Sequence, residues 1–138
     1  MSYIVADDLV AAYGHSLVNK ISTPEGSTQS DPAVIQRGID SAGSIIDAYI
    51  GGRYTLPLAV VPPVLVELAI DIAIYKISLA TTRRTPEMRL RYDDALKMLG
   101  EIADAKVSIG LSMSDLQANG DQDIVKQRLG KSIRTYRI

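Results

Sequence analysis

The chain has 138 residues and a net charge of −1, with 46% hydrophobic and 22% charged residues. This length predicts one domain with a single core, and the composition excludes wholesale disorder. The absence of cysteine excludes disulfides, thiolate metal sites and cysteine nucleophiles. Residues 1–8 have neither a basic region nor a long apolar run. We therefore predict no signal peptide, and expect the protein to be made in, and to stay on, the cytosolic side.

Two helices are predicted in the first part of the chain. Acidic residues open the first helix, residues 6–13, and Gly14 is expected to cap its end. Residues 21–30 are predicted to be a polar loop without core residues. Asp31 and Pro32 then form a typical helix start, with an acidic N-cap followed by proline. The apolar stripe of this second helix, which ends at Gly51-Gly52, consists of Ile35, Ile39, Ala42, Ile46, Tyr49 and Ile50.

An apolar joint with several prolines follows at residues 53–63. Proline has no backbone donor and a fixed φ, so the joint is predicted to be extended. Because exposed linkers are usually polar, we expect this segment to lie on a hydrophobic surface of its own subunit or of a partner. Physical reasoning alone favours a packed crossover loop, and a family signature is the alternative. The residues expected to determine the fold here are Arg53, Tyr54, Leu56, Pro57, Leu58, Pro62 and Pro63, of which Tyr54, Leu56 and Leu58 should pack mainly on the subunit's own helices.

The third predicted helix, residues 64–80, is apolar on almost every side. Such a helix is either the central buried element or packed on several sides at once. A membrane span is excluded, because Glu67, Asp71 and Lys76 lie within the apolar run. Spanning takes ~20 predominantly apolar residues, and a central charge costs ~3 kcal/mol on insertion.

Glu67 and Asp71 are one helical turn apart and form the only carboxylate pair on an apolar helix. Acid–base catalysis or metal binding would require further ligands, and the chain has a single histidine, His15, on a distant segment. We therefore favour a structural interpretation with no cofactor and no metal. The expected partners are Lys76, Arg83 and Arg84, as ion pairs between helices or between subunits.

The fourth predicted helix begins at Thr85-Pro86-Glu87 and is followed by a change of period. Its apolar face is Met88, Tyr92, Ala95, Leu96, Leu99, Ile102 and Ala103. After Lys106 an alternation with period two predicts a half-buried strand through Val107, Ile109, Leu111 and Met113. The predicted fold is thus mainly α. It is a compact bundle of about four helices with a proline-rich crossover joint, residues 1–106, and a C-terminal strand with a basic tail, residues 107–138.

The tail is predicted to be an assembly arm. Residues 126–138 carry +5, which leaves −6 on residues 1–125. A basic tail on an acidic body often mediates interactions, and a solvated terminus without a partner is the alternative. Its conformation, a short helix or an extended chain, stays open. Since an isolated hairpin is marginal in water, we expect another subunit or protein to complete the strand. The expected interface is Glu67, Asp71, Lys76, Val107, Ile109, Leu111, Met113, Lys126, Arg128, Lys131, Arg134, Tyr136 and Arg137.

No catalytic constellation is found in the sequence, so we predict that the protein is not an enzyme. Gly51-Gly52 follows a helix rather than a strand, and no Lys-Ser/Thr pair stands where a phosphate loop would need one. Two rival hypotheses remain from other classes. One is a small helical nucleic-acid-binding module that uses the basic tail. The other is an enzyme with Glu67 and Asp71 as a buried acid pair.

One ordered set of motifs resembles a known family. It comprises Asp8-Leu9, the run Ile45-Ile46-Asp47-Ala48-Tyr49-Ile50-Gly51-Gly52-Arg53-Tyr54-Thr55-Leu56-Pro57-Leu58, then Val61-Pro62-Pro63-Val64-Leu65, Ala69-Ile70-Asp71-Ile72-Ala73-Ile74-Tyr75, Arg91-Tyr92-Asp93-Asp94-Ala95-Leu96 and Val107-Ser108-Ile109-Gly110. Over roughly residues 3–110 this order is similar to the Mu-like phage and prophage head–tail connector (neck) proteins.

The resemblance implies a structural adaptor at the head–tail junction of the virion, made in the bacterial cytoplasm. Its implied partners are the portal protein and the tail-side neck proteins, with a passing contact to packaged DNA and no membrane. It also implies self-association into a ring of about twelve subunits, in which the same two surfaces meet around a closed axis.

Overall fold

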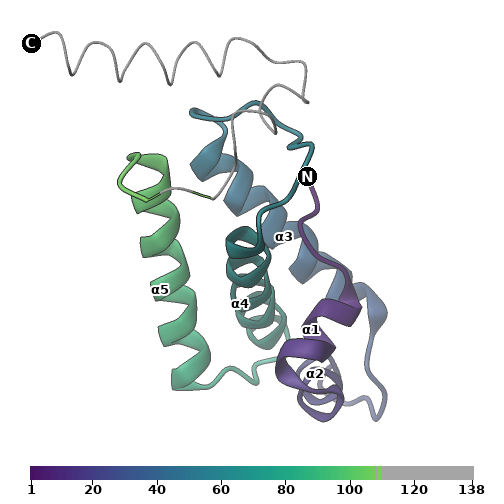
Figure 1. The fold of residues 1–138 in the computed structure, drawn as a ribbon. Coiled ribbons are helices and arrows are strands. Elements are labelled where there is room, and N and C mark those ends of the chain that lie inside the picture. Colours follow the sequence, from purple (N-terminus) through teal and green to yellow (C-terminus); the bar gives the residue numbers. More distant parts are fainter. Residues whose placement is uncertain (108, 110–138) are drawn as a thin grey trace, which may run out of the picture.

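The computed structural model describes residues 1–107 and 109 and is mainly helical, as predicted. Its five helices are α1 (Ala6–Tyr13), α2 (His15–Ile21), α3 (Pro32–Ile50), α4 (Pro63–Ala80) and α5 (Pro86–Ala103). The described residues contain no β-strand. Figure 1 shows α5 on one side of α4 and the α1–α2 pair on the other, with α3 running behind.

α4 is the central element of the bundle. It contacts each of the other four helices, and its side chains Leu65, Ile72 and Ile77 are completely shielded from solvent. Burial on several sides explains why its apolar residues show no single stripe. No helix in the described part of the chain is long and apolar enough to cross a membrane.

Proline and a polar cap define the start of α3 and α5, as the sequence predicted. Asp31 accepts a hydrogen bond from the backbone N–H of Ala33 at the start of α3. The hydroxyl oxygen of Thr85 accepts one from the N–H of Met88 at the start of α5. Both contacts satisfy backbone donors that have no partner within the helix.

The loop prediction for residues 21–30 is wrong at its beginning, because a further helix, α2, precedes it and ends at Ile21. Ile21 and Ser22 are buried rather than part of a loop without core residues. The hydroxyl of buried Thr81 donates a hydrogen bond to the carbonyl oxygen of Ile21, 2.5 Å away, and so joins the ends of α2 and α4. Gly14 separates α1 from α2 at φ 88°, a conformation that favours glycine.

The joint at residues 53–63 lies against the helices of its own subunit. Tyr54, Leu58 and Pro62 are buried, and Leu56 is half-buried against the core. Pro57 and Pro63 are exposed, and the Leu56–Pro57 peptide bond is cis. The observed path is therefore a packed crossover between α3 and α4.

Arg53 connects the joint to α5. Its Nη1 donates a hydrogen bond to the carbonyl oxygen of Ile102 at 2.6 Å. Val107 packs against the core, and Ile109 is buried in it. The rest of the predicted strand and the basic tail lie outside the described residues, so the division at residue 106 stays a prediction.

Candidate functional site

A chain of polar contacts links α1, α4 and α5 on one face of the bundle. The hydroxyl of Tyr13 donates to Oδ1 of Asp71 at 2.7 Å. The same hydroxyl accepts a hydrogen bond from Nη1 of Arg91 at 3.2 Å. Nη2 of Arg91 forms an ion pair with Oε1 of Glu87 at 2.8 Å. Tyr13 of α1 thus contacts both α4 and α5, the two helices on either side of the connection that ends at Thr85.

These contacts change the acidity of the Tyr13 hydroxyl. Burial and the hydrogen bond to Asp71 raise the pKa of Tyr13 to about 12, although Arg91 acts in the opposite direction. A phenol with such a pKa stays protonated at neutral pH and acts as a hydrogen-bond donor. The role of Tyr13 here is therefore to hold the helices together.

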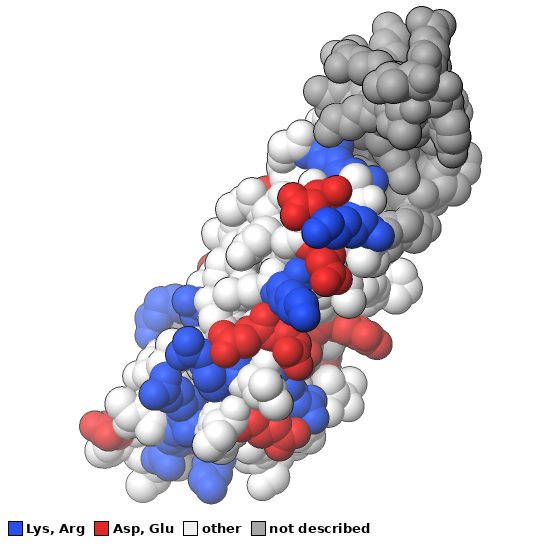
Figure 2. Space-filling model, turned by 90° about the vertical axis from the view of Figure 1, so that its left-hand side faces the viewer, with Lys and Arg blue, Asp and Glu red and all other residues white. Residues whose placement is uncertain are grey.

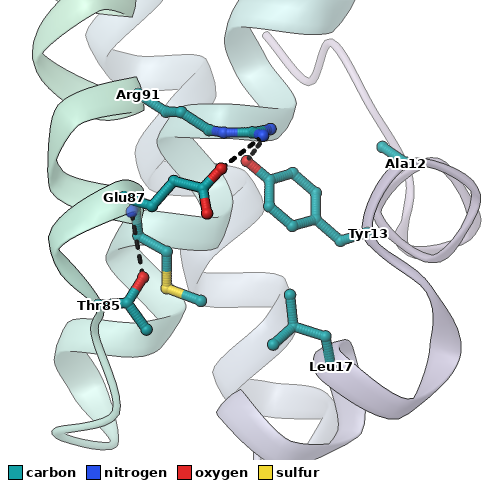
Figure 3. Close-up of a pocket in the computed structure, with 7 residues that line it drawn as sticks. Ala12, Tyr13, Leu17, Thr85, Glu87 and Arg91 are labelled. Atoms are coloured by element: carbon teal, nitrogen blue, oxygen red, sulfur yellow. Dashed lines mark hydrogen bonds and ion pairs between the residues drawn. The ribbon is translucent and has the colours of Figure 1, made fainter.

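A shallow pocket of about 310 Å³ lies beside this contact chain. In Figure 3, Tyr13 and Arg91 reach toward each other from α1 and α5, and Leu17 of α2 lies below them. The lining is Ala12, Tyr13, Leu17, Thr85, Glu87, Met88 and Arg91. This lining combines apolar side chains with hydroxyl and charged groups, which is typical of a site for a protein side chain or a small ligand.

A second aromatic cluster joins α4 to α5. The rings of Tyr75 and Tyr92 are stacked with their centroids 4.2 Å apart. The Tyr75 hydroxyl accepts hydrogen bonds from Arg89 at 3.1 Å and from Arg84 at 3.4 Å. Burial raises the pKa of Tyr75, but the two guanidinium groups outweigh it and the pKa falls below its ordinary value. The ammonium of Lys76 lies 5.5 Å from the centre of the Tyr92 ring, within the range of a cation–π contact.

The described residues offer no metal-binding group of three or more histidine or acidic side chains. His15 is exposed at the start of α2. The polar and aromatic contacts described above therefore join helices to one another, and no reaction is assigned to these residues.

The predicted interface residues are distributed over different environments. Glu67 is exposed on α4, whereas Asp71 is half-buried and bonded to Tyr13. The proposed ion pairs with Lys76, Arg83 and Arg84 do not form within the described residues, where the only side-chain ion pairs are Arg89–Asp93 and Arg91–Glu87. The reason is that a tyrosine hydroxyl, rather than a cation, reaches Asp71.

Two predicted interface residues lie on the subunit's own core. Ile109 is buried and Val107 is half-buried. The remaining candidates lie outside the described residues: Leu111, Met113, Lys126, Arg128, Lys131, Arg134, Tyr136 and Arg137.

Sequence reasoning missed the roles of Tyr13, Tyr75 and Arg91. The signal available was the composition, seven tyrosines with no phenylalanine or tryptophan. Tyrosine suits boundaries where a ring is buried and a hydroxyl finds a partner. Composition does not say which arginine or carboxylate that partner is, and the contacts of Tyr13 join residues 58 and 78 positions apart.

Comparisons with known proteins identify the family. Residues 3–127 match the family described as Bacteriophage Mu, Gp36. The chain is similar to the Mu-like prophage FluMu protein gp36 of Haemophilus influenzae, with 30% identity over 128 residues that cover 93% of this chain and 89% of that protein. It is also similar to Gene product J of Escherichia phage Mu, with 26% identity over 127 residues, or 91% of this chain and 89% of that protein.

The predicted resemblance to Mu-like phage proteins is thereby confirmed. The match extends into the tail, farther than the expected end near residue 110, and reaches residue 127. The chain belongs to the Bacteriophage Mu Gp36 family.

Proposed function

We propose that this protein is a structural subunit of a phage particle and acts as a head–tail connector at the junction between capsid and tail. In this role it binds the portal protein on one side and tail-side neck proteins on the other. It forms a ring of about twelve subunits around the path of the packaged DNA.

The observation that carries the proposal is the family match over residues 3–127, since the relatives are proteins of phage Mu and of a Mu-like prophage. The match contains the joint at residues 53–63, the segment most typical of the connector family. Tyr54 and Leu58 of the joint are buried within the subunit. We infer that the joint stabilises the fold of the subunit, and that partners bind to other surfaces.

Of the predicted interface, the exposed edge of α4 at Glu67 and the tail remain for contacts within the particle. Asp71, which is half-buried, lies one helical turn further along the same helix. Because Ile109 belongs to the core, the assembly arm begins after it. This position sets the site for a truncation that removes the arm and leaves the core intact.

Electron microscopy of the full chain mixed with the portal protein of its phage tests the proposal. The expected result is a ring of added density at the tail-side end of the portal. Deletion of residues 110–138 should abolish this density while the truncated chain keeps its helical circular dichroism and its cooperative unfolding. The full chain without portal is the control for spontaneous ring formation.

Two outcomes would contradict the proposal. One is a full chain that leaves the portal bare and binds only a tail-side protein. The other is salt-sensitive binding to DNA that disappears when the basic residues of 126–137 are neutralised, without any portal contact. The second result would favour the nucleic-acid-binding module.

A further inference from the structure

The outer face of α5 carries opposite charges at its two ends. Residues 83–91 contain four arginines and one glutamate, and residues 93–106 contain four carboxylates and two lysines. In Figure 2, blue side chains gather at the lower end of this face, red ones form a band across its middle, and red and blue alternate above that band. Glu25, bonded to the Thr82 hydroxyl at 2.9 Å, also reaches the basic end. The basic end remains positive with Glu25 included.

This order of charges opposes the dipole of the helix. Carboxylates are favourable near a helix N-terminus and cations near its C-terminus. On α5, Glu87 in the first turn follows the dipole, but Arg83 and Arg84 precede the N-terminus, and Glu101 and Asp104 lie at the C-terminal end without a basic residue in the last turn. Stability of the helix therefore does not explain the arrangement.

Part of the charge is already paired within α5. Arg89 binds Asp93, and Arg91 binds Glu87, each across one helical turn. Among the described residues, Arg83 and Arg84 have no ion-pair partner, nor have Asp94 and Asp104, and all four are exposed. Their charges can pair with a partner that has the complementary order of charges, although Arg84 also donates a hydrogen bond to the Tyr75 hydroxyl.

A second copy of α5 is such a partner when it lies antiparallel. The centres of the two charged ends are about 19 Å apart along a helix that rises ~1.5 Å per residue. In an antiparallel pair each basic end faces the acidic end of the other copy, whereas a parallel pair would bring like charges together. Leu90, 61% exposed between the two ends, adds an apolar contact near the centre.

We propose that the outer face of α5 is a two-fold self-association surface through which two copies of this chain form an antiparallel dimer. The contact is isologous, so the same residues serve on both subunits. It is independent of the portal and of the connector role, because it concerns the free protein. A nucleic acid would fit only the basic end and would be repelled by the acidic one.

Sedimentation equilibrium of the full chain tests this proposal. We expect a monomer–dimer equilibrium in NaCl at about 0.01 M that shifts toward monomer at about 1 M, where the screening length falls from ~30 Å to ~3 Å. A chain that stays monomeric at low salt would overturn the proposal, as would DNA binding by the basic end without dimer formation.

Charge reversal distinguishes this surface from the basic tail. The variant with Arg83→Glu and Arg84→Glu, and the variant with Asp94→Lys and Asp104→Lys, should each dimerise at least about ten-fold more weakly, because like charges then meet. The changes at Arg83, Arg84 and Asp104 follow the helix dipole at the ends of α5, and Asp94 is exposed in its middle, so neither variant should unfold the protein. The matched control with Lys20→Glu and Arg37→Glu changes two other exposed cations and should dimerise as the unmodified chain does.

Mixing the two reversed variants gives the decisive result. Neither variant should dimerise well alone. The arginine variant has two acidic ends on α5 and the aspartate variant has two basic ends, so one copy of each should form a heterodimer that does not grow further. A mixture that stays monomeric, or that grows into longer chains, would rule out the two-fold contact.

Discussion

Arg53 donates a hydrogen bond from Nη1 to the carbonyl oxygen of Ile102, 2.6 Å away. Arg53 lies just after α3, and Ile102 is in the last turn of α5, where carbonyl groups lack partners within the helix. A cation at this end is also favoured by the helix dipole. This single side chain therefore connects the joint to the C-terminal end of α5.

Replacing Arg53 should destabilise the fold. We expect Arg53→Ala to lower the free energy of unfolding by about 2 kcal/mol, the usual size of a hydrogen bond from a charged group. Urea denaturation measures this, with Arg37→Ala on the exposed face of α3 as the control, expected to change stability by less than about 0.5 kcal/mol. Equal effects of the two substitutions would show that the contact contributes nothing specific.

The joint offers a matched pair of apolar residues. Leu58 is 5% exposed and Val60 is 49% exposed. Leu58→Ala should cost about 3 kcal/mol, because it removes buried methyl groups and leaves a cavity. Val60→Ala should cost less than about 0.5 kcal/mol. If Leu58→Ala left thermal unfolding unchanged, the joint would not be part of the core.

Two glycines on helices should respond in opposite directions to alanine. A Cβ on Gly38 would collide with the Ile77 side chain and approach the Ala73 carbonyl oxygen to 3.1 Å, because α3 and α4 lie close there. Gly38→Ala should therefore cost about 2 kcal/mol through overpacking. A Cβ on Gly100 of α5 meets nothing within 4 Å, so Gly100→Ala should stabilise by about 0.5–1 kcal/mol. Thermal unfolding of both variants checks the sign, and stabilisation by both would contradict the close approach of α3 and α4.

Deprotonation of Tyr13 should lower the free energy of unfolding at alkaline pH. Its pKa is raised from 10.0 to about 12, so within that window the folded chain keeps a proton that the unfolded chain loses. The stabilisation is complete below the unfolded value and is lost as the pH rises through the window.

The Tyr13→Phe variant isolates this effect. It should lose about 1 kcal/mol at neutral pH, where the hydrogen bonds of the hydroxyl are missing. It should also show a shallower decline of stability between pH 10.0 and about pH 12. Burial and Asp47 also raise the pKa of Tyr3, but this tyrosine is present in both proteins. Identical slopes from urea unfolding would mean that the Tyr13 hydroxyl does not titrate differently in the folded state.

The sequence alone determined where the three long helices begin and that one of them is either central or packed on several sides. Proline at the first helical positions, with Asp31 or Thr85 as cap, is a local signal, because the cap and its backbone partner are two or three residues apart. The short helix α2 was missed, although Leu17, Val18 and Ile21 follow a helical spacing. The reason is that a glycine such as Gly14 also marks the place where a helix ends and a loop begins.

Only the tertiary structure decided which polar side chains meet. Tyr13 reaches Asp71 and Arg91, and Arg53 reaches Ile102, across 58, 78 and 49 positions of sequence. No periodicity encodes such pairs, since they depend on how α1, α3 and α5 lie around α4. The charges along α5 are readable in the sequence, but their exposure on one outer face is a property of the folded bundle.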